Sequence, residues 1–328
     1  MNKDKFNELL RASFKSDETE EWLDVHFNRP IGLAFALLWQ KLGVTPNTIT
    51  ILSIFLGIAA GVMFYYTDLA HNVAGAVLLM LANFCDSTDG QLARLTNQKS
   101  LLGRVLDGIS GDIWFFSIYL AFVLRLQHQM IPLIGLRWGI GIWVLAAIAG
   151  FLVHIPQSSL SDYYRQIHLF FLLGKEGSEL DNSKAQLALA ENLPREKWLD
   201  RLFHRYYGNY CKNQEKRTPQ FQAFFAQYKE LKAADPAKAA EISRELLDGS
   251  RPLMPYTNIL TFNTRAIVLC LTAMLNCPWV YFLFEIIVLT ILYVHMHHSH
   301  ERLCERLLEK MRILRLSESH DACINGRA

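Results

Sequence analysis

Three long stretches of the sequence lack any charged side chain. No Asp, Glu, Lys or Arg occurs in residues 42–67, 138–161 or 266–284. A helix needs about 20 mainly apolar residues to cross a bilayer, and helices of soluble cores seldom run that far without a charge. The chain of 328 residues is therefore expected to be an integral membrane protein, although apolar residues make up only 51% of it.

The sequence also lacks a charge imbalance, a disulfide pattern and an apolar leader. Its 33 Lys and Arg residues balance 31 Asp and Glu residues, which argues against a nucleic-acid partner. Its six cysteines form no C-x-x-C pair, which argues against a disulfide scaffold and fits a reducing compartment. Residues 1–24 are acidic without an apolar core, so we expect no cleaved signal peptide there.

The apolar pattern predicts an all-α protein with six transmembrane helices. These helices are expected near residues 48–66, 70–94, 104–126, 133–155, 259–276 and 279–297. The apolar and aromatic segment before them, 27–42, has a charge near each end and suits a helix lying in the membrane interface.

The expected organisation has five parts. They are a polar N-terminal segment with the interfacial helix at 1–45, four spans at 46–155, a helical insert at 156–258, two spans at 259–300 and a tail at 301–328. Because six is even, both termini share one side of the membrane. Basic residues in 94–104 and 301–315 place that side, together with the insert, in the cytoplasm.

Acidic side chains gather where the second predicted span ends and the third begins. Asp86 and Asp89 are three residues apart and share a helix face, and a hairpin would bring Asp107 opposite them. Charged groups inside spans are expensive and mark functional sites. Converging carboxylates need positive charge, and oxygen ligands favour Mg²⁺ or Mn²⁺ over zinc. A pair of such ions suits phosphoryl transfer, because they neutralise charge on the attacking and leaving oxygens.

The full pattern around these acids resembles the motif of the CDP-alcohol phosphotransferase (phosphatidyltransferase) family. The matching residues are Asp86, Asp89, Gly90, Ala93, Arg94, Gly103 and Asp107. The resemblance implies six spans, usually a homodimer, and displacement of CMP from a CDP-linked donor by an alcohol. It also implies that the three aspartates bind two divalent metal ions. The two glycines, the alanine and the arginine would surround the CDP moiety.

The sequence departs from the family at the fourth aspartate of the motif. The family places it at position 111, where this chain has Gly111, and the nearest acid is Asp112. On a regular helix Asp112 points about 140° away from Asp107, so only a π-bulge or kink would turn it back. In the family this aspartate binds metal and is the proposed base for the acceptor hydroxyl. We assign both roles to Asp112, with Asp107 as the second catalytic acid.

Two arginines are candidate ligands for the phosphate of a phosphorylated acceptor. Arg165 follows the fourth predicted span and Arg265 lies near the start of the fifth. In family members with such acceptors, basic residues of this region bind the phosphate. Snorkelling of the long side chains to the interface explains each arginine equally well. Glu285, in the last span, has no obvious partner except Arg265.

Other polar or small residues in the spans receive structural interpretations. Gly57 and Gly61 are four residues apart in the first span and predict close helix packing. Cys85 is interpreted as a small buried residue, because no base adjoins it. A histidine group near the end of the last span is interpreted as interfacial rather than metal-binding. It consists of His295, His297, His298 and His300.

The sequence thus indicates phospholipid synthesis by transfer of a phosphatidyl group from CDP-diacylglycerol to a polar alcohol, with release of CMP. A polyol such as inositol or inositol phosphate is the favoured acceptor, while glycerol phosphate and serine stay open. One alternative is a CDP-head-group phosphotransferase that acts on diacylglycerol. Another is a non-catalytic membrane homologue that binds or transports its ligand, which Gly111 keeps open. Metal-dependent release of CMP would distinguish an enzyme from such a homologue.

Overall fold

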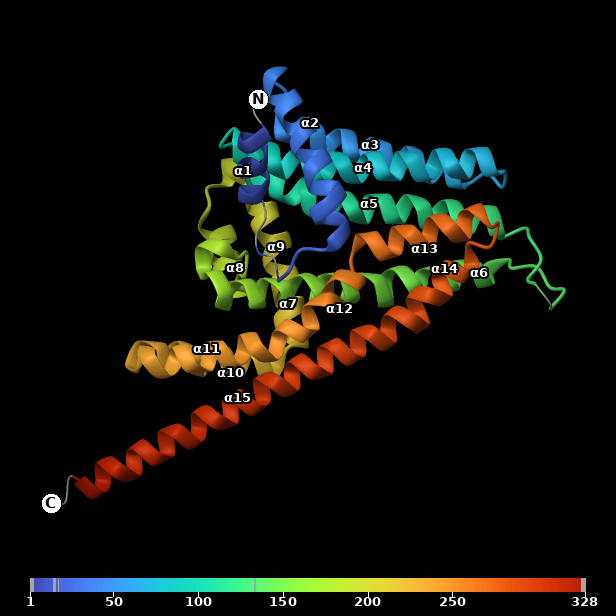
Figure 1. The fold of residues 1–328 in the computed structure, drawn as a ribbon. Helices are drawn as coiled ribbons and strands as arrows, with labels where there is room; N and C mark the ends of the chain where they lie inside the picture. Colours follow the sequence, from blue (N-terminus) through green and yellow to red (C-terminus); the bar gives the residue numbers. More distant parts are fainter. Residues whose placement is uncertain (1–2, 14–15, 17, 99, 133, 326–328) are drawn as a thin grey trace.

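The computed structural model describes a helical protein over residues 3–13, 16, 18–98, 100–132 and 134–325 (Figure 1). Within these residues there is one isolated β-bridge, between Met130 and Arg137, and no β-strand. The predicted all-helical fold is confirmed.

The helices follow one another in three groups. The first group is α1 (Lys3–Ser13), the π-helical η1 (Asp24–Asn28), α2 (Arg29–Lys41), α3 (Pro46–Phe64), α4 (Leu69–Leu95), α5 (Leu101–Leu126), α6 (Ile140–Ala147), the π-helical η2 (Ile148–His154) and α7 (Ile155–Leu173). The second is η3 (Lys175–Gly177), α8 (Ser183–Asn192), η4 (Arg195–Lys197), α9 (Trp198–Arg217), α10 (Pro219–Ala234), α11 (Pro236–Ser250), η5 (Arg251–Leu253) and α12 (Met254–Ile259). The third is α13 (Phe262–Met274), α14 (Trp279–Leu283), the π-helical η6 (Phe284–Leu289) and α15 (Thr290–Asn325).

Five of the described helical segments are long and apolar enough to cross a membrane. They are α3, α4, Val105–Leu126 within α5, Ile140–Leu173 across α6, η2 and α7, and Trp279–Leu316 across α14, η6 and α15. Figure 1 shows α3, α4 and α5 running side by side. Their length and composition support the expected membrane protein.

The first three of these helices begin at side-chain caps. Thr45 precedes Pro46 and its Oγ1 accepts a hydrogen bond from the Thr48 amide at 3.4 Å. Ser100 caps α5 in the same way, with its Oγ 2.9 Å from the Gly103 amide. Each cap satisfies an amide that the first helical turn leaves without a partner. These caps fix where α3 and α5 start. They therefore also fix the position, along the helix axes, of the acidic residues near them.

The segment predicted as the fifth span is shorter than expected. α13 has 13 residues, which makes it about 20 Å long, whereas the hydrocarbon core is about 30 Å thick. Its start is set by extended backbone at Thr261, and it stops before Asn276, which has a φ of +57°. The described residues therefore contain five candidate spans, and the prediction of six is not confirmed at α13.

The fourth candidate span continues far beyond its predicted end at residue 155. α7 runs on to Leu173, where Gly174 with a φ of +82° ends it. Few residues other than glycine adopt this left-handed conformation without strain. The predicted insert therefore begins with helix that extends the span.

α3 packs closely against α5 at two glycines. A Cβ on Gly57 would lie 2.0 Å from Cδ1 of Trp114, and one on Gly61 would lie 2.9 Å from the Ser117 backbone. Only glycine, whose side chain is a single hydrogen atom, permits this close approach of the two helices. The interpretation of both glycines as packing positions is confirmed.

The insert forms a second helical layer beyond the ends of the spans. α10 and α11 pack against α15, and their shared core buries Phe221, Phe224, Leu246 and Met311. α9 stands apart from this layer and crosses α5 and α7 (Figure 1). The insert therefore reaches back to the start of the third span.

Candidate metal centre

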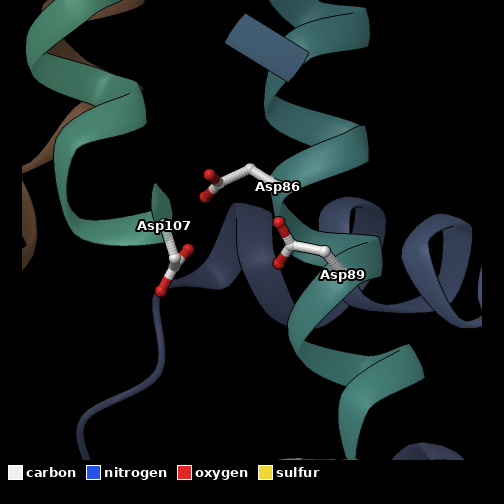
Figure 2. Close-up of side chains that lie close together, drawn as sticks. All are labelled: Asp86, Asp89 and Asp107. Atoms are coloured by element: carbon white, nitrogen blue, oxygen red, sulfur yellow. The ribbon is translucent and has the colours of Figure 1, made fainter. Parts of the chain in front are cut away.

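Three carboxylates from two neighbouring helices converge at one end of the bundle. One oxygen of each of Asp86, Asp89 and Asp107 lies within 4.8 Å of the others. Figure 2 shows Asp86 and Asp89 projecting from α4 towards Asp107 at the start of α5. Asp89 is buried, Asp86 is half-buried and Asp107 is exposed. The hairpin predicted to bring these acids together is thus present.

The donor set of this cluster fits a divalent cation. Three carboxylates at such separations repel one another, and partial burial makes the repulsion stronger than in water. A bound cation removes this cost, and hard oxygen ligands are those that Mg²⁺ prefers. The Asp86, Asp89 and Asp107 group could therefore hold metal.

Two hydroxyl groups hold the carboxylates in position. Oγ1 of the buried Thr50 donates a hydrogen bond to Asp89 Oδ2 at 2.5 Å, across from α3 to α4. Ser110 Oγ lies 2.9 Å from Asp86 Oδ1, across from α5 to α4. Sequence reasoning missed both roles. A buried hydroxyl on a helix facing an acidic motif is a weak signal that could have indicated them.

The residues expected around the CDP moiety occupy the helix ends beside the carboxylates. A Cβ on Gly103 would lie 2.8 Å from Asn47 Oδ1, so this position needs glycine for the approach of α3. Gly90 and Ala93 lie on α4 next to Asp89, and Arg94 is in the last turn of that helix. A Cβ on Gly90 would meet only the Arg94 guanidinium, at 3.8 Å. This end of α4 is therefore open to a ligand near Gly90.

The backbone between Asp107 and Asp112 is regular α-helix. α5 is uninterrupted from Leu101 to Leu126, so the π-bulge that would turn Asp112 towards the metals is absent. Asp112 does not belong to the three-carboxylate group. At Gly111, where the family motif has its fourth aspartate, a Cβ would meet nothing within 4 Å. The fourth carboxylate position is open space in this structure.

Two cavities meet beside the carboxylates. The larger, of about 530 Å³, has the more polar lining of the two and is called the polar cavity below. It is lined from α4, α5, α7 and α9, with Asp86, Asp107 and Asp112 on its wall. The smaller, of about 330 Å³, is apolar and lies between α5 and the α6–η2 helix. Asp112, Phe115, His154 and Ile155 line both. Asp112 thus stands at the junction of a polar and an apolar space.

Arg265 lies at the wall of the polar cavity, but its donors are engaged inside the protein. The buried guanidinium pairs with Glu285, donates to Gln157 Oε1 at 2.7 Å and donates through Nε to the Leu260 carbonyl at 3.0 Å. Glu285 also accepts a hydrogen bond from Tyr281 at 2.7 Å. Arg265, the one partner that the sequence offered for Glu285, is thus its partner in the structure.

Arg165 is placed differently from Arg265. It donates to Asn258 Oδ1 at 2.9 Å and is not among the residues that line the polar cavity. The structure therefore brings one of the two predicted arginines to the cavity, and the other is not part of the cavity lining.

The histidine group packs against aromatic rings. His297 Nδ1 lies 2.5 Å from the Tyr164 hydroxyl, and the buried His300 stacks on the same ring at a centroid distance of 4.1 Å. Among the described residues the group that could hold a metal is the aspartate cluster.

Comparison with known proteins finds similarity in the part of the chain that holds this site. Residues 43–172 match the sequence model of the CDP-alcohol phosphatidyltransferase family. An archaetidylinositol phosphate synthase of Pyrococcus horikoshii is 33% identical over 99 residues, which are 29% of this chain and 51% of that protein. A bifunctional IPC transferase and DIPP synthase of Aquifex aeolicus is 25% identical over 143 residues, which are 42% of this chain and 31% of that protein. The chain thus spans about half or less of these relatives, and helices α8 to α15 lie outside the family match.

Proposed function

We propose that the protein, whose residues 43–172 match the sequence model of the CDP-alcohol phosphatidyltransferase family, transfers a phosphatidyl group from CDP-diacylglycerol to a polar alcohol. CMP is the second product. The observation that carries the proposal is the cluster of Asp86, Asp89 and Asp107 beside a polar cavity. This cavity adjoins an apolar one, which suits a donor that has a charged head and acyl chains.

The proposed roles follow from the positions of the side chains. Asp86, Asp89 and Asp107 would hold two Mg²⁺ or Mn²⁺ ions together with Asp112, which lies outside the three-carboxylate group and would have to turn towards it. When bound, such ions supply positive charge for the attacking and leaving oxygens. Gly90, Ala93, Arg94 and Gly103 would line the CDP site, where the glycines give space and the arginine pairs with the diphosphate.

The proposed reaction is a displacement at phosphorus. The acceptor hydroxyl gives its proton to a carboxylate oxygen of Asp112 and its oxygen bonds to the phosphorus that carries the diacylglyceryl group. The bond between that phosphorus and the CMP oxygen breaks, and CMP leaves. Asp107 belongs to the cluster and lines the cavity, and it would be the second catalytic acid.

The acceptor is proposed to be a polyol such as inositol or inositol phosphate. The Pyrococcus relative is an archaetidylinositol phosphate synthase, which supports this class of acceptor. Arg265 and Arg165 are the candidate ligands for an acceptor phosphate. Arg265 would have to release Gln157 or Glu285 before it could take that role.

The assembly is proposed as a homodimer in the cytoplasmic membrane. α13 would supply a sixth, short span beside α14, which places both termini, the insert and the carboxylates on the cytoplasmic side. The basic residues of 94–104 and 301–315 support this orientation.

The test is CMP release by purified protein in detergent with CDP-diacylglycerol and Mg²⁺ or Mn²⁺. The acceptor panel is inositol, inositol phosphate, glycerol phosphate and serine. We expect release with one acceptor, and loss of at least about 1000-fold in Asp107→Asn, because removing charge stabilisation at the transition state has effects of that order. Asp248→Asn, an exposed carboxylate on α11, is the matched control and keeps full activity.

The same assay separates the alternatives. Loss of release in Asp112→Asn supports that residue as the base, and full activity in this variant removes the assignment. Release only with CDP-linked head groups and diacylglycerol would indicate the reversed donor. A binding or transport homologue would release no CMP with any pair, and Asp107→Asn would leave its function intact.

A further inference from the structure

The first half of α9 carries an exposed apolar stripe. Trp198, Leu202 and Tyr206 follow one another at intervals of four residues, so they share one helix face. Their exposed fractions are 62%, 54% and 49%, and the adjacent Leu199 is 46% exposed. Exposed large apolar side chains gathered on one helix mark an interaction surface.

Basic side chains surround this stripe. Residues 195–217 contain seven Lys and Arg against three Asp and Glu, whereas the whole chain has a net charge of only +2. Arg195 and Lys197 are exposed just before the helix begins, and Arg205 is exposed beside Tyr206. A helix with an aromatic and aliphatic face flanked by Lys and Arg is typical of binding to anionic membranes.

The position of α9 puts the stripe at the level of the membrane surface. α9 packs against α5, and Figure 1 shows it running across the direction of the spans. Tyr206 lines the polar cavity together with Val105 and Asp112, which lie in the first turns of the third candidate span. α9 therefore crosses α5 where that span begins, and not farther out with α10 and α11.

Exposed apolar residues of the fourth candidate span lie at the same cavity as Tyr206 of the stripe. Ile155, which lines the polar cavity with Tyr206, is 47% exposed, and Phe151, one turn before it, is 63% exposed. Phe151 and Ile155 belong to the fourth candidate span, so their exposed sides face lipid.

We propose that residues 198–206 of α9 lie in the headgroup layer of the bilayer and bind anionic lipid. Trp198, Leu199, Leu202 and Tyr206 enter the boundary with the acyl chains, while Arg195, Lys197 and Arg205 contact the headgroups. The insert is thereby held to the membrane at a second place, apart from the spans.

The fluorescence of Trp198 tests this placement without any need for enzyme activity. Wild type and Trp198→Phe are reconstituted in nanodiscs of phosphatidylcholine and phosphatidylglycerol, and the difference in their emission gives the contribution of Trp198. We expect this contribution to be blue-shifted and to be quenched when the lipids carry brominated acyl chains. Quenching by aqueous iodide without quenching by brominated lipid would overturn the proposal.

A second variant calibrates the measurement. Lys232 is exposed on α10, so Lys232→Trp in the Trp198→Phe background should be quenched by iodide and not by brominated lipid. For the charge contribution, Arg205→Glu should reduce brominated-lipid quenching of Trp198, and Lys232→Glu should not. Equal effects of the two charge reversals would remove the anionic-lipid part of the proposal.

A second copy of the chain is the competing occupant of the stripe. In that case Trp198 would be shielded from both quenchers, and Leu202→Asp would halve the mass of the particle in native mass spectrometry. That pair of results would overturn the membrane assignment.

Discussion

At the scale of single residues, hydroxyl groups from outside the acidic motif hold its carboxylates. Thr50 comes from α3 and Ser110 from α5, and each contacts a carboxylate of α4. Such contacts orient ligands before the metal arrives, and their loss in metalloproteins typically weakens binding.

Thr50→Val should therefore weaken metal binding while the fold is kept. Valine has nearly the same shape but cannot donate the hydrogen bond to Asp89. We expect the Mg²⁺ or Mn²⁺ concentration for half-maximal CMP release to rise about 10- to 100-fold. Thr48→Val, the same exchange at an exposed position two residues earlier, is the control. An equal rise in both variants would contradict the role of Thr50.

The two glycine environments predict opposite results for the same substitution. Gly57→Ala places a methyl group against Trp114, and overpacking of this kind costs about 1–3 kcal/mol. Its apparent melting temperature in detergent should fall. Gly111→Ala meets nothing within 4 Å and should keep or slightly raise that temperature, because alanine is the better helix former. Equal melting temperatures for the two variants would refute the close packing of α3 on α5.

At the scale of elements, Glu18 ties the N-terminal segment to the insert. Its Oε2 accepts hydrogen bonds from His168 Nε2 of α7 and Arg251 Nε of η5, both at 2.9 Å. The hydrogen bond from Arg251 is the main cause that lowers the pKa of Glu18 below its usual 4.5, with His168 adding to it against the effect of burial. A lowered pKa means that the folded state favours the charged carboxylate.

The stability contributed by Glu18 should depend on pH in a defined direction. Because the folded pKa is lowered, the contribution is complete above the unfolded pKa of about 4.5 and disappears as the pH falls through the folded value. Glu18→Gln should therefore be more sensitive than wild type to protease cleavage near residue 18 at pH 7, and the difference should shrink at pH 4. Glu176→Gln, at an exposed position after α7, should match wild type at both. A difference that grows on acidification would refute the pairing.

The same scale shows what the sequence could and could not predict. The start of α3 could be predicted from the sequence because Thr45 and Pro46 act locally on the first helical turn. The short α13 could not be predicted, because no glycine or proline marks the break at Thr261 and the segment 266–284 carries no charge. The direction of Asp112 depended on a bulge that residues next to it permit but do not require.

Some contacts of the candidate site could be predicted from the sequence and others could not. Asp86, Asp89 and Asp107 were predictable because they lie within one hairpin, and their spacing determines the shared face. The contact of Thr50 with Asp89 joins residues 39 apart in the chain, and the tyrosines of α9 reach the cavity from an insert outside the family match. Such contacts follow from the packing of whole elements, which local patterns do not encode.

At the scale of the whole molecule, a buried ion pair joins the last two helical segments to the fourth span. Arg265 on α13 contacts Glu285 on η6 and Gln157 on α7. Burying two charges is expensive, and removal of one partner leaves the other uncompensated. The pair thus secures α13, which is too short to be held by lipid contacts along a full span.

Single and double substitutions of this pair should give unequal losses. Arg265→Met and Glu285→Leu should each destabilise the protein by about 3–5 kcal/mol, because each strands a buried charge. The double variant should lose less than either single variant, since neither charge remains. Apparent melting temperatures in one detergent provide the comparison. Additive losses would mean that the two groups act independently.

α15 passes without interruption from the membrane into the core of the insert, where Met311 is buried. With 36 residues it is about 54 Å long, and its first part belongs to the fifth candidate span. Bilayers of different thickness change the tilt of such helices, and at this length each degree of tilt moves the far end by about 1 Å. Bilayer thickness would in this way change how closely the insert lies to the carboxylates. The membrane would then affect the geometry of the site as well as surround the protein.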